Sequence, residues 1–116
     1  MRTSELTGAA LDWAVAEAEG FFKDDMASVR NGVVDVFYFD EYSPSTDWSQ
    51  GGEIIERERL SITPREGYWE AYCHDNLFKD DGSDHFQMGT TPLIAAMRCY
   101  VASKLGGSVQ LPEELK

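Results

Sequence analysis

Residues 45–52 gather the side chains of this chain that are best suited to binding a small ligand. The tryptophan of this segment offers a flat face on which a base or a sugar ring can stack. Its two glycines let a ligand approach the backbone closely, and two arginines farther along the chain can meet an anionic group. The residues predicted to bind a ligand are Ser45, Thr46, Asp47, Trp48, Gln50, Gly51, Gly52, Arg57 and Arg98.

The same segment also has a purely structural interpretation. Residues 43–47 are rich in turn formers. In this interpretation, residues 42–50 form a surface loop in which Trp48 packs at the edge of the core and Asp47 caps the turn that follows. Loops carry such residues for structural as well as functional reasons, so both interpretations stay open.

No arrangement typical of catalysis or cofactor binding is found in the sequence. A phosphate loop would need a glycine-rich run ending in Gly-Lys-Ser or Gly-Lys-Thr, and Gly51 and Gly52 lack the third glycine of a dinucleotide fingerprint. The chain has only two histidines and no paired-carboxylate motif. We therefore expect a non-enzymatic protein without a cofactor.

Two groups of residues resemble metal ligands without fitting a known spacing. Cys73, His74, His85 and Cys99 lack the paired spacing of a zinc module, and adjacent residues of a strand point to opposite faces. The acidic loop at residues 75–89 lacks the bidentate acid that ends a calcium loop. We expect no metal site, and two free thiols in a reducing cytoplasm.

The chain is strongly acidic. Twenty-one Asp and Glu against ten Lys and Arg give a net charge of −11, which excludes a general nucleic-acid binder and disfavours adsorption to an anionic membrane. Residues 1–84 hold nineteen of the acids and residues 85–112 hold none. The acid-free stretch carries Arg98 and leaves room for an anionic ligand, unless it is simply a buried helix with few charges of either sign.

The order of predicted elements is that of a single domain spanning residues 1–116. A helix over residues 8–19 is capped by Thr7 and ends at Gly20. A strand follows at residues 33–39, a single helical turn at 53–57, two antiparallel strands at 59–63 and 67–73, and an edge strand at 108–111. A second helix opens at Thr91 and Pro92 and ends at Gly106.

These elements predict an α+β fold in which two helices pack on a small, mostly antiparallel β-sheet. Leu93, Met97 and Val101 form the core stripe of the second helix, which has little polar surface on any side. We expect this helix to be covered by the sheet and by either the first helix or a second copy of the chain. Trp13 and Trp69 are expected to be covered as well.

Three blocks of the sequence are shared with one family. They are TSELTG with LDWAVA (residues 3–8 and 11–16), PSTDWSQGG with IIER (44–52 and 54–57), and TPLIAAMRC with VASKLG (91–99 and 101–106). Together they resemble the NinX-like family of phage proteins, which are encoded in the nin region of lambdoid phages. Residues 21–42 and 75–87 do not match, and Glu53 stands where the family pattern has proline. The resemblance implies a phage accessory protein in the host cytoplasm, outside the virion, with no catalytic residue to carry over.

Two functional hypotheses follow. In the first, the protein sequesters a small nucleotide-like host defence signal in a pocket around residues 45–52, where Trp48 stacks on the base and Arg57 or Arg98 meets the phosphate. In the second, an acidic interaction module inhibits a host nucleic-acid-binding or defence protein by occupying its basic cleft. The first requires Trp48 and a cation to converge, and the second requires acids on one exposed face. A homo-oligomer is compatible with either.

Overall fold

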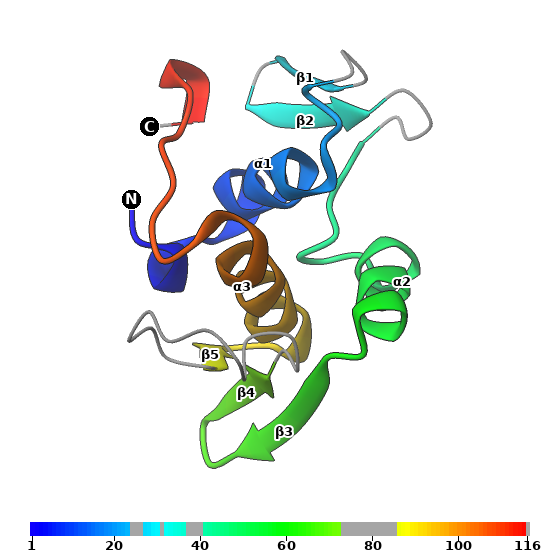
Figure 1. Cartoon of the computed structure of the whole chain (residues 1–116), viewed down its shortest axis with the longest axis vertical. Helices are drawn as coiled ribbons and strands as arrows, with labels where there is room; N and C mark the ends of the chain where they lie inside the picture. The colour runs from blue at the N-terminus through cyan, green and yellow to red at the C-terminus, as the bar shows by residue number, and fades with distance from the viewer. Residues whose placement is uncertain (24–26, 31, 37–40, 73–85, 116) are drawn as a thin grey trace.

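A computed structural model describes residues 1–23, 27–30, 32–36, 41–72 and 86–115 (Figure 1). This part of the chain forms three α-helices, two short 3-10 helices and five strands. In chain order they are η1 (Thr3–Glu5), α1 (Gly8–Glu19), β1 (Ala27–Arg30), β2 (Val33–Val36), α2 (Trp48–Glu58), β3 (Ser61–Arg65), β4 (Tyr68–Tyr72), β5 (Phe86–Gly89), α3 (Pro92–Leu105) and η3 (Glu113–Leu115).

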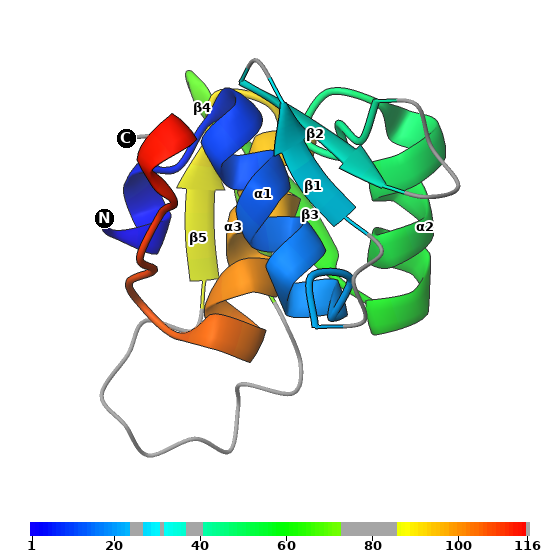
Figure 2. The same ribbon diagram turned by 90° about the horizontal axis from the view of Figure 1, so that it is seen from above.

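Helix α3 is the centre of the molecule. Figures 1 and 2 show α1 on one side of it, the sheet of β3, β4 and β5 on the other, and α2 beside it. Leu93, Met97 and Val101 are buried, as the apolar stripe predicted. The predicted cover on two sides is confirmed, and it is supplied within one chain by the sheet and α1. This extensive burial also explains why α3 carries so few charges.

The strands form two antiparallel sheets. In the first, β1 pairs with β2 so that Arg30 lies opposite Val33. In the second, the order is β3-β4-β5. β5 runs close under α3 at Gly89, where an added Cβ would lie 2.5 Å from the backbone nitrogen of Ala95. Only glycine fits at this crossing, so the contact fixes the depth at which α3 lies on its sheet.

The α+β class is confirmed, but the predicted architecture of two helices on one sheet is wrong in detail. The loop and single turn predicted over residues 42–57 contain the eleven-residue helix α2. Its glycines, Gly51 and Gly52, favoured a loop locally, and tertiary packing overrides that preference. The acidic loop predicted at 75–89 ends in β5, because pairing with β4 decides the conformation there and is invisible in the local sequence.

The two ends of the described chain lie next to each other (Figure 1). The edge strand predicted at residues 108–111 is wrong: Ser108 makes only an isolated antiparallel bridge, opposite Arg2. The terminal ammonium of Met1 donates to the carbonyl of Val109 at 2.8 Å, and the N–H of Val109 donates to the carbonyl of Met1 at 2.9 Å. These bonds tie the start of the chain to the segment after α3.

Several other expectations are tested by the described residues. α1 begins after Thr7 and ends at Gly20, as predicted. Trp13 and Trp69 are half-buried against the core, and Trp13 lies 5.7 Å from the ring of Phe22. Cys99 is buried. In the described ranges, no helix has the length and apolar character needed to cross a membrane.

Three of the four residues considered as metal ligands lie outside the described residues. Cys73, His74 and His85 fall in the range 73–85, as does most of the predicted acidic loop. The strand predicted at 33–39 is confirmed over Val33–Val36, and its remaining residues also lie outside the described ranges.

Candidate functional site

The segment predicted to be a ligand-binding loop leads into a helix. Asp47 is the N-cap of α2, and its Oδ1 accepts hydrogen bonds from the backbone N–H of Ser49 at 2.9 Å and from its hydroxyl at 2.6 Å. The bonds from the hydroxyl and the N–H of Ser49 lower the pKa of Asp47 below its ordinary value, which keeps a negative charge at the positive end of the helix. The capping role predicted for Asp47 is confirmed.

Gln50 and Gly51 hold the start of α2 against the rest of the molecule. The Oε1 of Gln50 accepts the N–H of Ser43 at 2.6 Å, and its Nε2 donates to the carbonyl of Glu41 at 3.1 Å. A Cβ on Gly51 would lie 2.3 Å from the carbonyl oxygen of Pro44 and 2.7 Å from Cδ2 of Leu93. Gln50 therefore has its main hydrogen-bonding atoms occupied, and Gly51 serves close packing between helices.

Ser45 is 1% exposed and is anchored to α1. Its backbone N–H donates to Oδ1 of Asp12 at 2.9 Å. Burial raises the pKa of the Asp12 carboxyl from 3.8 to about 6, although the bond from Ser45 acts in the opposite direction and Glu41 adds a small repulsion. Desolvation of a carboxylate therefore outweighs its hydrogen bond at this position.

Trp48 is 55% exposed, so the interpretation that packed it at the edge of the core is wrong. Its ring lies above Gly52, one turn along α2, where an added Cβ would stand 3.7 Å from Cε3 of the indole. Beside it is a hollow of about 210 Å³. The described residues that line the hollow come from the first turns of two helices and from the approach to them, and all are uncharged: Ser45, Thr46, Trp48, Thr91, Pro92, Leu93 and Ile94.

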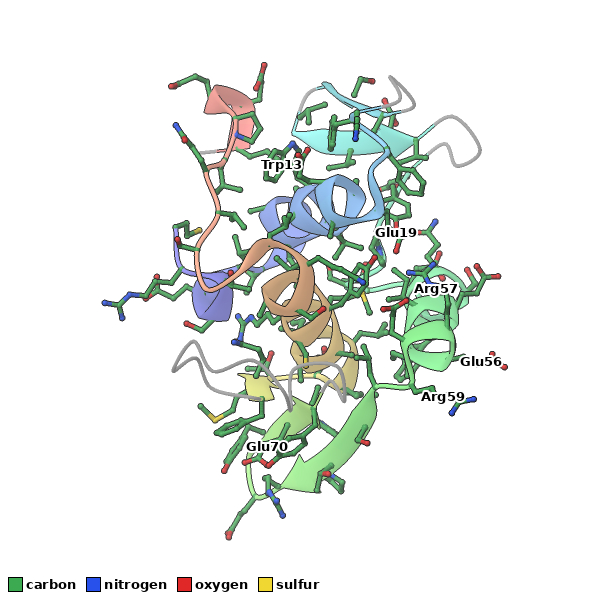
Figure 3. All side chains as sticks on the ribbon, in the orientation of Figure 1. Trp13, Glu19, Glu56, Arg57, Arg59 and Glu70 are labelled. Carbon is green, nitrogen blue, oxygen red and sulfur yellow. The ribbon has the colours of Figure 1, made fainter. Side chains whose placement is uncertain are left out.

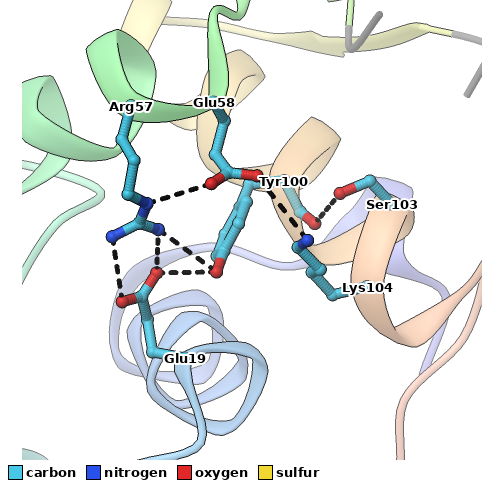
Figure 4. Close-up of polar contacts among 6 residues, drawn as sticks. All are labelled: Glu19, Arg57, Glu58, Tyr100, Ser103 and Lys104. Atoms are coloured by element: carbon cyan, nitrogen blue, oxygen red, sulfur yellow. Dashed lines mark hydrogen bonds and ion pairs between the residues drawn. The ribbon is translucent and has the colours of Figure 1, made fainter. Parts of the chain in front are cut away.

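Arg57 joins the three helices instead of facing this hollow (Figure 4). Both of its terminal nitrogens donate to the carboxylate of Glu19 on α1, and its Nε donates to Glu58 at 2.9 Å. Tyr100 of α3 donates its hydroxyl to Glu19 at 2.6 Å, and the Arg57 guanidinium lies 5.7 Å from the centre of the Tyr100 ring. Lys104 approaches Glu58 at 3.6 Å.

This network separates Arg57 from Trp48. The hydrogen bonds to Glu19 shift the pKa of Arg57 upward, so the guanidinium stays positively charged. Arg57 also follows Trp48 by nine residues, which is about 13.5 Å along a helix at about 1.5 Å per residue. Its guanidinium is therefore committed to Glu19 and Glu58, at a distance from the indole.

Arg98 lines a different hollow, also of about 210 Å³, together with Ser4, Phe86, Gln87 and Met88. Its Nε donates to the carbonyl of Leu6 at 2.8 Å, and its Nη1 donates to the carbonyl of Met88 at 2.7 Å. The structure thus does not bring the nine predicted residues together: Asp47, Gln50, Gly51 and Gly52 build the start of α2, and the other five lie at three places. Ser45, Thr46 and Trp48 share one hollow, Arg57 lies in the interhelical network, and Arg98 lines the second hollow.

The outer face of α2 carries Trp48 and two exposed acids, and the exposed Arg59 follows at its C-terminal end. At 3.6 residues per turn, Trp48, Gly52 and Glu56 form one row, and Glu53, three residues before Glu56, lies next to Glu56 on the side of the helix that also presents Arg57. Glu53 and Glu56 are exposed, and Figure 3 shows Glu56 and Arg59 directed away from the body of the molecule. Glu41, just before the helix, is exposed too. We call Trp48, Glu53 and Glu56, with the hollow beside Trp48, the α2 face.

Sequence reasoning missed several residues that build these sites. Asp12, Glu19 and Tyr100 lie 33, 38 and 43 positions from their partners Ser45, Arg57 and Arg57. No local pattern signals contacts of that range. One signal for the Trp48 hollow was present in the sequence. Thr91 and Pro92 mark the start of α3, and both residues line that hollow.

Comparison with known proteins identifies one family. The family model described as "Bacteriophage P22, NinX" matches residues 2–104. The match covers the first two blocks on which the resemblance was based and the third as far as residue 104, and it includes the described residues of both hollows. A search of curated proteins finds no match to the chain.

Proposed function

The chain belongs to the NinX family of bacteriophage proteins, and from that premise we propose that it is an accessory protein that binds a host protein through the α2 face and catalyses no reaction. The partner presents a basic surface, and binding blocks it. A phage accessory protein of this kind works in the host cytoplasm, where its partner is. The exposed position of Trp48, beside an uncharged hollow and in a row with Glu56, is the observation that carries the proposal.

An exposed tryptophan beside a hollow is suited to anchoring a protein partner. Interfaces are enriched in tryptophan, and the residues with the largest effect on affinity are often aromatic side chains beside a pocket on the partner or on the same surface. The hollow beside Trp48 is lined by Pro92, Leu93 and Ile94 as well as by hydroxyl groups. An apolar side chain of the partner would fill it and cover one face of the indole.

The acids around Trp48 favour a basic partner over an anionic one. Glu53, Glu56 and Glu41 are exposed on or next to α2, in a chain whose net charge is −11. Such a field accelerates encounter with a positively charged surface and repels phosphates, and both effects weaken with salt. Rim acids of this kind mainly set the association rate and its salt dependence.

The placement of the arginines does not support the nucleotide hypothesis at this site. That hypothesis requires a cation beside Trp48. Arg57 donates to Glu19 and Glu58, and Arg98 lines the other hollow. A phosphate beside Trp48 would meet the acids of α2, while Arg57 is held by Glu19 and Glu58 and the exposed Arg59 lies eleven residues along the chain. The acidic interaction module is therefore the hypothesis that we carry forward.

The test compares the partners of matched variants in infected cells. Tagged wild type, Trp48→Ala and the double variant Glu53→Gln/Glu56→Gln are purified, and bound host proteins are quantified by mass spectrometry. Tyr68→Ala is the control, because Tyr68 is a 37% exposed aromatic at the turn end of the β3–β4 hairpin. The proposal expects one basic host protein to be lost from Trp48→Ala and retained by Tyr68→Ala.

The interaction is then measured with the purified partner. Loss of a central aromatic typically costs about 2 kcal/mol or more, so Trp48→Ala should weaken binding about 30-fold. The glutamine variant should bind more slowly and show a weaker salt dependence. If instead a nucleotide co-purifies with wild type and is absent from Trp48→Ala, the first hypothesis is correct and this proposal is wrong.

A further inference from the structure

We propose that the hollow beside Arg98 binds a small oxyanion, namely a phosphate or carboxylate group. A guanidinium has five N–H donors. In the described part of the chain, Arg98 uses two of them, toward the carbonyls of Leu6 and Met88. The guanidinium lines a hollow of about 210 Å³, so donors that these carbonyls leave unused are available to a bound group.

The charge of Arg98 is not neutralised within the described residues. Arg57 contacts Glu19 and Glu58, and Arg65 contacts Glu70 at 3.1 Å. Among the described residues, the hydrogen bonds of Arg98 go to carbonyl oxygens, which solvate a cation without cancelling its charge. Burial lowers the pKa of Arg98. A partly buried charge without a counter-charge is unfavourable, and a bound anion would relieve this cost.

The neighbours of Arg98 are suited to an anion. Ser4 and Gln87 line the hollow and carry a hydroxyl and an amide that can donate hydrogen bonds to oxygen. Phe86 and Met88 supply apolar walls, which strengthen an ion pair by excluding water. β5 and α3, on which four of the five lining residues lie, belong to the stretch without any Asp or Glu. In a chain of net charge −11, this is a local exception.

The size of the hollow limits the ligand. Sites for drug-sized molecules occupy about 300–1,000 Å³, and this one offers about 210 Å³. It suits inorganic phosphate, a small phosphate monoester or a short carboxylic acid, whereas a dinucleotide signal would extend outside it. The site differs from the α2 face both in its charge and in its lining residues.

Arg98 also has a structural role that any test must separate from binding. Its two hydrogen bonds connect the segment before α1 to β5, so replacing Arg98 would disturb the fold as well as the site. Gln87→Glu avoids this problem, because it leaves both carbonyl bonds in place and adds a negative charge to the wall of the hollow. Gln110→Glu adds the same charge at an exposed position outside the lining and serves as the control.

The experiment titrates inorganic phosphate into the wild type and the two variants at constant ionic strength, by calorimetry and by the thermal unfolding midpoint. The proposal expects phosphate to bind and to raise the midpoint of wild type and Gln110→Glu, and expects Gln87→Glu to bind at least tenfold more weakly. A purely structural Arg98 predicts no binding to any of the three proteins. An equal effect of phosphate on all three would show a general salt effect, and either result overturns the proposal.

Two further titrations identify the source of the anion. Glycerol phosphate represents a phosphate monoester and succinate represents a carboxylic acid, each measured with wild type and with Gln87→Glu. Tighter binding of one of them, sensitive to Gln87→Glu, names the class. Trp48→Ala should bind these anions as wild type does. The proposed anion site and the proposed role of the α2 face can therefore be disproved independently of each other.

Discussion

The two hollows have the same volume, about 210 Å³ each, and opposite chemistry. The hollow beside Trp48 has an exposed aromatic ring and, among the described residues, an uncharged lining, and acids stand on the neighbouring helix. The hollow beside Arg98 has a cation that no acid among the described residues pairs with, and four of its five lining residues belong to a stretch without acids. A ligand with both a base and a phosphate needs both features in one place, and this fold keeps them apart.

Helix α3 contributes to both hollows and explains the separation. Its first turn supplies Pro92, Leu93 and Ile94 to one hollow, and Arg98 supplies the guanidinium of the other. A cation and an aromatic ring that look like one ligand set in the sequence therefore suit two different ligands. The α2 face suits a basic protein surface, and the Arg98 hollow suits a small anion.

The largest predicted effect concerns the packing of α2 against Pro44 and Leu93, next to the Trp48 hollow. Gly51→Ala would place a Cβ 2.3 Å from the backbone carbonyl of Pro44, which cannot move aside as a flexible side chain would. We expect a loss of about 3 kcal/mol in the free energy of unfolding, the upper end of the usual cost of overpacking. Urea denaturation measures it.

Gly52→Ala is the matched control. Its Cβ would stand at an ordinary distance of 3.7 Å from the Trp48 ring, and alanine is favoured over glycine inside a helix by about 0.5–1 kcal/mol. Gly52→Ala should therefore be slightly stabilising. Equal stability of the two alanine variants would mean that Gly51 does not pack against Pro44 and Leu93 as described.

The second prediction concerns the carboxyl that anchors the approach to α2. Asp12 has a pKa of about 6 in the fold, against 3.8 as its ordinary value. Between these values the folded state holds more protons than the unfolded chain, so raising the pH from about 4 to about 6 lowers the free energy of unfolding through this group. The shift corresponds to about 2–3 kcal/mol, which is lost completely above pH 6.

Asp12→Asn isolates this contribution, since its amide oxygen can still accept the Ser45 N–H. Relative to wild type, the variant should gain about 2–3 kcal/mol between pH 4 and pH 7. Urea denaturation of both proteins across that range measures the difference. A difference that stays constant with pH would show that Asp12 is not desolvated.

Much of the fold could be predicted because it depends on local signals. α3 has an N-cap threonine, a proline in its first turn, an apolar stripe and a terminal glycine, and α1 has Thr7 and Gly20. α2 was missed because Gly51 and Gly52 lower its local helix propensity. These glycines are needed by contacts with Pro44, Leu93 and Trp48 that only the folded chain makes.

The candidate site could be predicted only in part, for the same reason. The cap at Asp47 involves Ser49, two residues away, and it was anticipated. The partner carbonyl of Arg98 on Leu6 is 92 residues away, and the partner carboxylate of Arg57 on Glu19 is 38 residues away. The sequence shows that Trp48, Arg57 and Arg98 are available to bind a ligand, but where these side chains lie in space depends on how the three helices pack.

The third prediction removes the contact that holds α2 to the other helices. Arg57→Gln leaves Glu19, whose side chain is 13% exposed, with only the Tyr100 hydroxyl as donor among the described contacts. Half of the Arg57 side chain is exposed, so solvent screens the pair, and we expect a loss of about 1 kcal/mol. The difference from wild type in urea denaturation should shrink in 1 M salt. A salt-independent loss would indicate packing of the arginine stem instead.

The smallest predicted effect is the change in the free energy of unfolding on replacing Trp48, and it tests whether this tryptophan is a surface residue or part of the core. Trp48→Ala should change the free energy of unfolding by about 0.5 kcal/mol or less, because surface residues outside caps and cores have effects of this size and the side chain is 55% exposed. Trp13, half-buried against the ring of Phe22, is the comparison: Trp13→Ala should cost about 3 kcal/mol. Thermal and urea unfolding of both variants measure the contrast. If Trp48→Ala were as destabilising as Trp13→Ala, its loss of partner binding would reflect unfolding, and the α2 face would lose the residue on which its assignment rests.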